Sequence, residues 1–289
     1  MRIAVIGASG TIGCGLVPAL AREHEVLALA RRPTVSGGAV TSRAADARDR
    51  DSLVRAIGRA DVLYHLVHSL GTRSFAAEDR RAAEAVASAA ARVGASQIVY
   101  LGGLADDAAG RSEHLRSRAE TARYLASGPV PVTTLRAAMV VGRGSAALET
   151  IRALVDRLPA MVCPRWVANE TEPVALTDVV RYLVGVAGRD EALARGYDVG
   201  GPEVMTYRMM IERIGRLRAR RPRIAEVPLL SPRVSSLWLH LVTPVEASVA
   251  RPLVESLRAR TVAREHEIRE LVPFSLTPFD DAAREALSA

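Results

Sequence analysis

The sequence predicts an α/β fold with a doubly wound parallel sheet and a smaller C-terminal lobe. Short apolar runs of strand type alternate with helical patterns from the N-terminus to about Gly142, which is typical of a parallel sheet covered by helices. The first apolar run leads into a glycine-rich turn and then a helical pattern. With 289 residues, of which 49% are hydrophobic, the chain is long enough to bury a large core.

The strands expected in the sheet are short, and helical patterns separate them. The first strand covers 2–6, and the helix after the glycine-rich turn carries Leu16, Val17 and Leu20 at helical spacing. Further strands are expected at 25–30, 40–43, 61–67, 97–101 and 130–135. The helices between them are expected near 51–57, at 75–93 and at 112–125.

The pattern loosens beyond Gly142, where the second part of the chain begins. Helices are expected at 148–158, 177–186 and 206–217, and short strands at 173–176 and 197–199. Thr177 or Asp178 is expected to cap the helix 177–186. From Pro222 on, prolines are frequent and the alternation is lost. We therefore predict a core over 1–143, to which 171–187 return, and a substrate-covering lobe over 144–170 and 188–289.

The composition favours a soluble, cytoplasmic protein that acts on a small molecule. The start carries no charged segment followed by an apolar one, and no apolar stretch is long enough to span a membrane. The two cysteines form neither a disulfide framework nor a metal-ligand pattern. The net charge is +7, but no aromatic residue interleaves with the densest basic run, 213–223. We interpret that run as a solvated helix end, and we expect no nucleic-acid or membrane partner and a monomer or homodimer.

The turn after the first strand has the features of a dinucleotide-binding turn. It reads GASGTIG over 7–13, between an apolar run and a helix start. Gly7 permits the tight turn, Gly10 lets the backbone approach a pyrophosphate, and Gly13 lets the helix pack on the strand. The helix N-terminus supplies free N–H donors and a partial positive charge for the phosphates.

The end of the second strand indicates which nicotinamide cofactor binds. An acidic residue there bonds the adenosine ribose of NAD, whereas arginine accommodates the 2′-phosphate of NADP. Here Arg31 and Arg32 follow the strand and no acid is present, so the sequence predicts NADP(H). Asp46, after the third strand, is placed to bond the adenine amino group, although an Asp-initiated turn or helix cap explains it almost equally well.

Several segments in order resemble one enzyme superfamily: GASGTIG, ALARRP, AADARD, YHLVHSLG, IVYLGGL and PVTTLRAAMVVGRGS. The chain resembles atypical or extended short-chain dehydrogenases/reductases, and within them the NAD(P)H-binding, NmrA-like group. This resemblance implies a Rossmann-type fold and covers nearly the whole chain. It implies a pyrophosphate site at Gly7, Ser9, Gly10, Thr11, Ile12 and Gly13, a 2′-phosphate site at Arg31 and Arg32, and an adenine contact at Asp46. It implies that Leu66 and Val67 line the cofactor, and that Ala137, Ala138 and Met139 pass near the nicotinamide.

The chain departs from the resemblance at the catalytic residues. The superfamily uses a serine and a Tyr-x-x-x-Lys motif. The matching positions here hold Gly102–Gly103, His114 and Arg118, and all 39 basic residues of the chain are arginines. Arg118 can reach nicotinamide-ribose hydroxyls, but it does not titrate near neutral pH. His114 is a candidate acid/base or a plain surface histidine. His68, which follows the fourth strand, is a candidate catalyst or cleft-lining residue.

These residues support three functions. The first is an NADPH-dependent reductase of a small apolar carbonyl, enone or quinone-like compound, with His114, His68 and Arg118 in place of the usual catalytic set. The second is an NADP(H)-sensing, NmrA-like regulatory protein, favoured by the loss of that set. The third is a redox-neutral isomerase or cyclase of secondary metabolism on the same fold. A sensor binds both redox states without turnover, and a redox-neutral enzyme consumes no NADPH.

Overall fold

A seven-stranded parallel sheet forms the centre of the protein. The computed structural model describes the chain except for residues 34–35, 70–71, 73, 105–111, 228–254 and 289. The strand order is β11-β6-β5-β4-β1-β2-β3, and every pair in the sheet is parallel. The bounds are β1 Arg2–Ile6, β2 Glu25–Ala30, β3 Val40–Ala44, β4 Val62–His65, β5 Gln97–Gly103, β6 Val132–Ala137 and β11 Gly196–Val199. The predicted Rossmann-type, doubly wound sheet is therefore confirmed.

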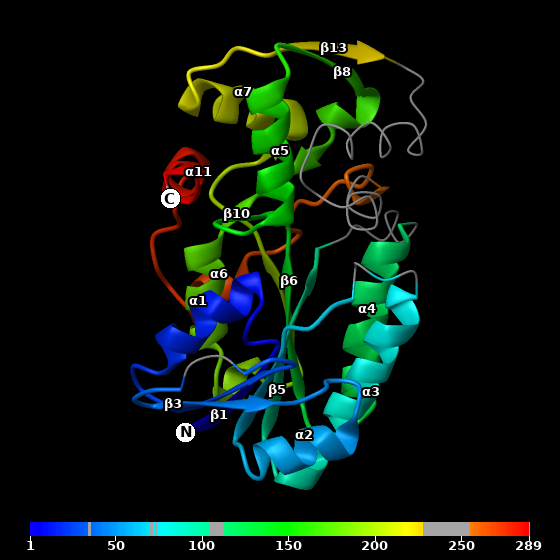
Figure 1. Cartoon of the computed structure of the whole chain (residues 1–289), viewed down its shortest axis with the longest axis vertical. Coiled ribbons are helices and arrows are strands. Elements are labelled where there is room, and N and C mark those ends of the chain that lie inside the picture. The colour runs from blue at the N-terminus through cyan, green and yellow to red at the C-terminus, as the bar shows by residue number, and fades with distance from the viewer. Residues whose placement is uncertain (34–35, 70–71, 73, 105–111, 228–254, 289) are drawn as a thin grey trace.

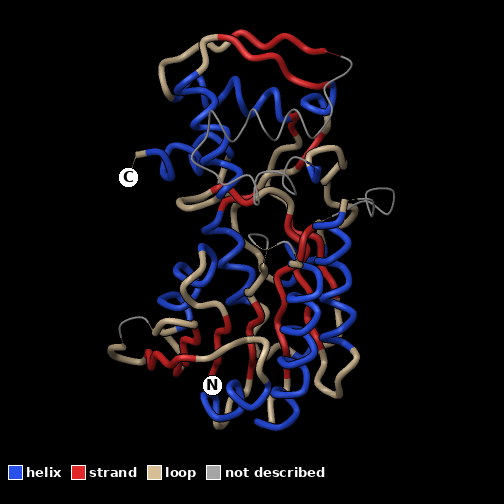
Figure 2. The backbone as a smooth tube through the Cα atoms, turned by 45° about the vertical axis from the view of Figure 1, so that its right-hand side comes forward, coloured by secondary structure: helices blue, strands red, loops and turns tan. Residues whose placement is uncertain are grey.

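Helices cover both faces of this sheet, as Figures 1 and 2 show. On one face lie α1 (Thr11–Leu20) and α6 (Leu176–Gly185), and on the other lie α2 (Arg50–Ile57), α3 (Phe75–Val93) and α4 (Glu113–Ala126). The strand β1 shows how the sheet serves both layers. Its residues Ile3 and Val5 belong to the first apolar core, whereas Ala4 and Ile6 belong to the second. This alternation follows from the two-residue period of a strand.

A smaller lobe follows the carboxyl end of β6 (Figure 1). Its own apolar core joins three helices and nearby strands. These elements are α5 Ala146–Arg157, α7 Tyr207–Leu217, α11 Phe279–Leu287, β8 Ala160–Pro164 and β13 Arg223–Val227. Two short ladders pair β7 (Val140–Val141) with β10 (Val174–Ala175), and β9 (Glu170–Thr171) with β12 (Met205–Thr206). The basic run at the end of α7 is partly neutralised, because Arg213 pairs with Glu203 and Arg218 with Asp156.

Two segments that the sequence places in the lobe pack with the seven-stranded sheet and its helices instead. The strand β11 completes the sheet beside β6. Residue Ile268, in α10 (Glu267–Leu271), joins the apolar core on the α1 face. Two buried carboxylates bind the chain on either side of α10. Glu172 accepts from the Ala263 N–H, and Asp178 accepts from the Thr277 N–H. Neither β11 nor α10 therefore belongs to the predicted lobe over 188–289.

The start of α6 also differs from the prediction. The residue before this helix is Ala175, and no side chain caps it. Asp178 lies inside the first turn, fully buried, and accepts hydrogen bonds from the Thr277 main chain and hydroxyl at 2.7 and 3.0 Å. Neither Thr177 nor Asp178 is the cap. Among the described residues, no helix is long and apolar enough to cross a membrane.

Candidate functional site

The glycine-rich turn lies at the carboxyl edge of the sheet, between the ends of β2 and β4. Gly7 follows β1 with a φ of +95°, a conformation that favours glycine. Its N–H and that of Ala8 donate to the Leu29 carbonyl at 3.0 and 3.1 Å. A Cβ at Gly7 would lie 3.1 Å from the Leu66 carbonyl carbon. The turn is therefore tightly packed at the point where the strand order reverses, which is where ligands of doubly wound sheets bind.

The other two glycines of the turn face different surroundings. A Cβ at Gly13 would lie 2.5 Å from the Gly7 oxygen, so Gly13 permits the contact between α1 and the turn. A Cβ at Gly10 would meet nothing nearer than 3.4 Å. The first helical hydrogen bond runs from the Cys14 N–H to the Gly10 carbonyl, so the three N–H groups before it point out of the helix end. This open, donor-rich cradle fits the pyrophosphate of a dinucleotide.

The Thr11 side chain has a second role at this turn. Its hydroxyl donates to the Gly144 carbonyl at 2.9 Å, and Gly144 directly precedes the cap of α5, Ser145. This hydrogen bond uses the single hydroxyl proton and joins the turn to the lobe. The main-chain N–H of Thr11 is therefore the donor left for a phosphate. Of the other predicted phosphate residues, Ser9 is exposed and Ile12 packs on the apolar core.

The predicted adenosine end of the site lies beyond β2. Arg31 and Arg32 are both exposed there. Asp46 accepts from the Arg48 N–H at 3.0 Å and from two nitrogens of its guanidinium at 2.9 and 3.0 Å. The hydrogen bond with the Arg48 side chain lowers the pKa of Asp46, and the charge of Arg31 adds to the effect. Asp46 therefore stabilises the local turn. Its contact with adenine stays a prediction, and in that contact the adenine amino group would bond a carboxylate oxygen that already accepts from Arg48.

A cluster of nitrogen-bearing side chains gathers where β4 and β5 end against α4. Arg118 is at its centre and is only 7% exposed. Its Nη2 donates to the Leu101 carbonyl, and its guanidinium carbon lies 5.0 Å from the centre of the Tyr100 ring. The Tyr100 hydroxyl in turn donates to the Arg118 carbonyl at 3.1 Å. The Nη1 atom is buried and has no hydrogen-bond partner among the residues that the structure describes. A buried donor without a partner is costly, so it fits an acceptor supplied by a ligand, such as a ribose hydroxyl or a substrate oxygen.

The structure brings the two candidate catalytic histidines together beside Arg118. The ring centres of His68 and His114 are 6.5 Å apart. Burial lowers the pKa of His114 to about 4, and the charge of Arg118 adds to the effect. The pKa of His68 is lowered chiefly by the loss of water around its ring and next by the charge of Arg118, although the residue as a whole is exposed. Both rings are therefore neutral at pH 7, and neither titrates near 6.5 as a free histidine does.

His65 is a fully buried residue of β4 that packs inside the protein. Its ring centre is 5.8 Å from that of Tyr100. Neither ring nitrogen has a hydrogen-bond partner within the described ranges of the chain. Burial lowers its pKa to about 3, and the charge of Arg118 contributes.

This burial predicts a dependence of stability on pH. The unfolded chain binds a proton at His65 near pH 6.5 and the folded chain only near 3, so the free energy of unfolding decreases as pH falls below 6.5. Between pH 7 and 5 the loss from His65 is about 2 kcal/mol. We expect His65→Phe to gain that amount on the wild type over this interval in urea unfolding curves. Parallel pH dependences for the two proteins would contradict this assignment.

Leu66, Val67, Ala138 and Met139, which are predicted to line the cofactor, lie after the carboxyl ends of β4 and β6. Leu66 and Val67 follow β4 and pack directly against Gly7. Ala138 and Met139 follow β6. The Ala138 N–H donates to the Val199 carbonyl, and the Met139 carbonyl accepts from the Val174 N–H at 2.9 Å. The turn, the linker after β4 and the histidine cluster thus share one edge of the sheet.

Sequence reasoning missed Asp79, Ser117 and Tyr100, which support the cluster. Asp79 accepts from the Ser117 hydroxyl at 3.1 Å. Asp79 lies on the same buried helix face as Ala82 and Ala83. A charged residue on the alanine-rich face of a helix that packs on a sheet is the sequence signal that could have identified it.

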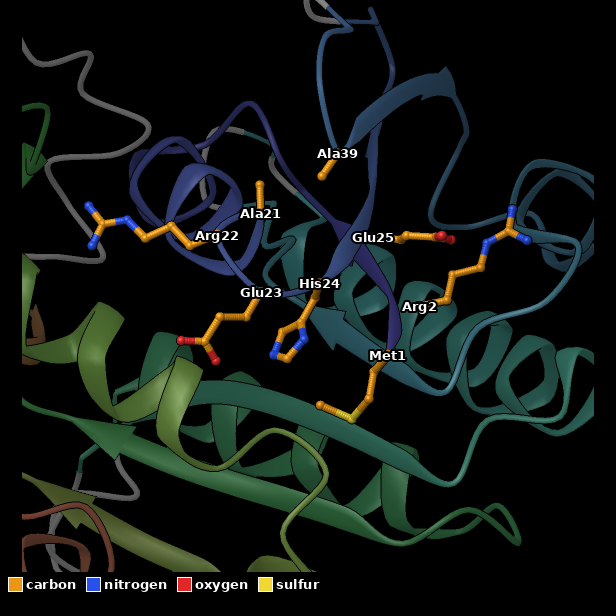
Figure 3. Close-up of a pocket in the computed structure, with 8 residues that line it drawn as sticks. All are labelled: Met1, Arg2, Ala21, Arg22, Glu23, His24, Glu25 and Ala39. Carbon is orange, nitrogen blue, oxygen red and sulfur yellow. The ribbon is translucent and has the colours of Figure 1, made fainter.

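A separate surface hollow lies at the other end of the sheet. Figure 3 shows it at the amino ends of β1 and β2, with Met1, Arg22, Glu23 and His24 among its lining residues. It is distant from the glycine turn, because β1 separates the two. Ligands of parallel sheets bind at the carboxyl edge, so we do not assign the cofactor to this hollow.

Comparisons with known proteins agree with the cofactor turn. Residues 7–146 match the family model described as NAD(P)H-binding. An uncharacterized protein of Mycobacterium tuberculosis is 30% identical over 220 residues, which are 75% of this chain and 23% of that protein. The (4-alkanoyl-5-oxo-2,5-dihydrofuran-3-yl)methyl phosphate reductase of Streptomyces griseus is 28% identical, over 99% of this chain and 98% of the relative. The first of these relatives is thus much longer than this chain.

Solved structures show the same fold. A nucleoside-diphosphate-sugar epimerase of Staphylococcus aureus superposes with a TM-score of 0.79 at 15% identity, covering 99% of this chain and 100% of the other. The NADPH-dependent quinone oxidoreductase of Escherichia coli, complexed with NADPH, gives 0.76 at 18% identity and covers 99% of each chain. At such identities the likeness shows the fold alone. Residues 7–146 match the NAD(P)H-binding family model, and this match and the shared fold are consistent with the predicted resemblance to short-chain dehydrogenases/reductases.

Proposed function

We propose that the protein is an NADPH-dependent reductase of a small apolar carbonyl, enone or quinone-like compound. The observation that carries this proposal is the pairing of an open phosphate turn at Gly10 with a buried, unpartnered Nη1 of Arg118 on the same sheet edge. The reductase from Streptomyces griseus, similar over nearly its whole length, supports it. The test is oxidation of NADPH, followed by its absorbance, with a panel of enones, quinones and isolated ketones.

The residues of the chain divide the work as follows. The N–H groups at the start of α1 bind the pyrophosphate, and Arg31 and Arg32 bind the 2′-phosphate. Bound NADPH supplies the hydride. Arg118 and the neutral rings of His68 and His114 orient the substrate oxygen by donating hydrogen bonds, which strengthen as that oxygen gains negative charge. Because neither ring is protonated at pH 7, the final proton comes from solvent that reaches the exposed side of His68.

One alternative has a specific observation in its favour. The lowered pKa values of His68 and His114 leave no histidine acid at neutral pH, as expected for a protein that senses NADP(H) without turning it over. A sensor binds NADPH and NADP⁺ with no oxidation of NADPH by any compound of the panel.

The choice of cofactor gives a prediction of its own. Because Arg31 and Arg32 are exposed at the end of β2 and no acidic residue directly follows that strand in the sequence, we expect NADPH to bind at least about tenfold tighter than NADH, or about 1.4 kcal/mol. Arg31→Asp or Arg32→Asp should reduce that ratio in calorimetric titrations. Arg22→Asp, an exposed arginine after α1, is the matched control and should keep it. Equal affinities of the wild type for the two cofactors would exclude an NADP(H) site.

A further inference from the structure

The carboxylate of Asp79 lies inside the protein, although it belongs to no cofactor motif. It sits in the second turn of α3 and is 2% exposed. Burying a carboxylate costs several kcal/mol unless hydrogen bonds and an opposite charge compensate for the lost water. Such a residue therefore has a structural partner or a functional reason to be there.

Each oxygen of Asp79 holds a different part of the histidine cluster. Oδ1 accepts from the main-chain N–H of Ser69 at 2.8 Å, and Oδ2 accepts from the hydroxyl of Ser117 at 3.1 Å. Ser69 directly follows His68. Ser117 lies one turn after His114 on α4. One carboxylate thus joins the segment that carries the first histidine to the helical turn that carries the second.

The charge of Asp79 also acts on Arg118. Burial raises the pKa of Asp79, whereas the nearby guanidinium and the two hydrogen bonds work in the opposite direction. The Arg118 Nη2 donates to Leu101 rather than to this carboxylate, and its Nη1 has no partner in the described part of the chain. Asp79 therefore offsets the buried positive charge without forming a hydrogen bond to Nη1.

We propose that Asp79 is a positioning residue. It holds the segments of His68 and His114 side by side and offsets the buried charge of Arg118, the residue that the proposed function assigns to the nicotinamide half of the cofactor or to the substrate. This inference rests on the proposed function for its consequence, but the arrangement of the two histidines can be measured without it.

The test uses two variants, one control and two probe ligands. Asp79→Asn keeps the size and removes the charge, and Asp79→Ala removes both. Glu84→Gln, an exposed carboxylate on the same helix that pairs with Arg80, is the matched control. The ligands are NADPH and 2′,5′-ADP, which lacks the nicotinamide half. Calorimetry gives the affinities, and NMR of the histidine rings reports contact between His68 and His114.

The expected result separates the two halves of the cofactor. Both variants of Asp79 should bind 2′,5′-ADP within about twofold of the wild type, because the phosphate turn is untouched. Binding of NADPH should weaken by about fivefold or more, and the contact between the two histidine rings should be lost in Asp79→Ala. The control should match the wild type in every measurement.

Three other outcomes have separate meanings. Wild-type NADPH affinity and an intact ring contact in both variants would overturn the positioning role. An equal loss of both ligands in both variants would also overturn it, because that indicates a role in folding alone. If the wild type binds neither ligand, the proposed function fails, and the ring contact in Asp79→Ala then decides the positioning role by itself.

Discussion

Gly10→Val is expected to lose NADPH binding while the protein still folds. A Cβ at this position meets no atom nearer than 3.4 Å, and the φ of −78° suits any residue. The side chain would therefore occupy the space in front of α1 that the pyrophosphate requires. We expect affinity for NADPH to fall by about 100-fold or more, equivalent to about 2.7 kcal/mol. Calorimetric titration measures the affinity, and thermal unfolding measures the fold.

The matched comparison is Gly13→Ala, three residues further on. Its Cβ would lie 2.5 Å from the Gly7 carbonyl oxygen and 2.6 Å from that of Ala8, which are both main-chain atoms of the turn. This variant should lose about 1–3 kcal/mol of stability, because the helix has to move away from the strand. If Gly10→Val keeps the affinity of the wild type, the pyrophosphate is not held at this turn.

Local patterns were sufficient to predict most of the sheet. The strand Glu25–Ala30 and the helix Phe75–Val93 have the predicted bounds, since each is a long periodic segment with clear flanks. The strand expected to reach Val67 ends at His65, because the chain there turns across Gly7. The strand β11 was placed in the lobe because its partner β6 lies about 60 residues earlier, and no local pattern reports such a pairing.

The candidate site could be predicted only in part. The glycine spacing identifies the turn, because the need for glycine at these positions arises from the space within and in front of the turn itself. The positions of His114 and Arg118 follow from the resemblance. Their electrostatics do not, because the lowered pKa of His114 depends first on its burial in the folded chain and then on the charge of Arg118. The same holds for Asp79, whose bond to Ser117 spans 38 residues.

The guanidinium of Arg118 should be the group on which turnover depends most. Hydride addition places negative charge on a substrate oxygen, and a fixed positive charge in a buried site stabilises that charge strongly. Arginine side chains as a class carry a fixed charge, whereas His114, with a pKa of about 4, is neutral at pH 7. Catalysis by this set therefore needs no titration between pH 6 and 8.

We expect Arg118→Met to lower kcat by about 10²- to 10³-fold. Its affinity for NADPH should fall less than about tenfold, since the phosphate contacts remain. A methionine of similar size fills the buried position, but Asp79 loses a nearby charge that offsets its burial, so thermal unfolding is measured beside kcat to establish that the variant folds. His114→Ala or His68→Ala should lower kcat by about 10²-fold, because each removes a hydrogen-bond donor to the developing charge. The decisive measurement is the pH dependence of kcat in the wild type: a flat profile from pH 6 to 8 agrees with charge stabilisation by Arg118. A bend between 6 and 7 that disappears in His114→Ala would instead identify a histidine acid, and would mean that the site is less buried in its working state than in this structure.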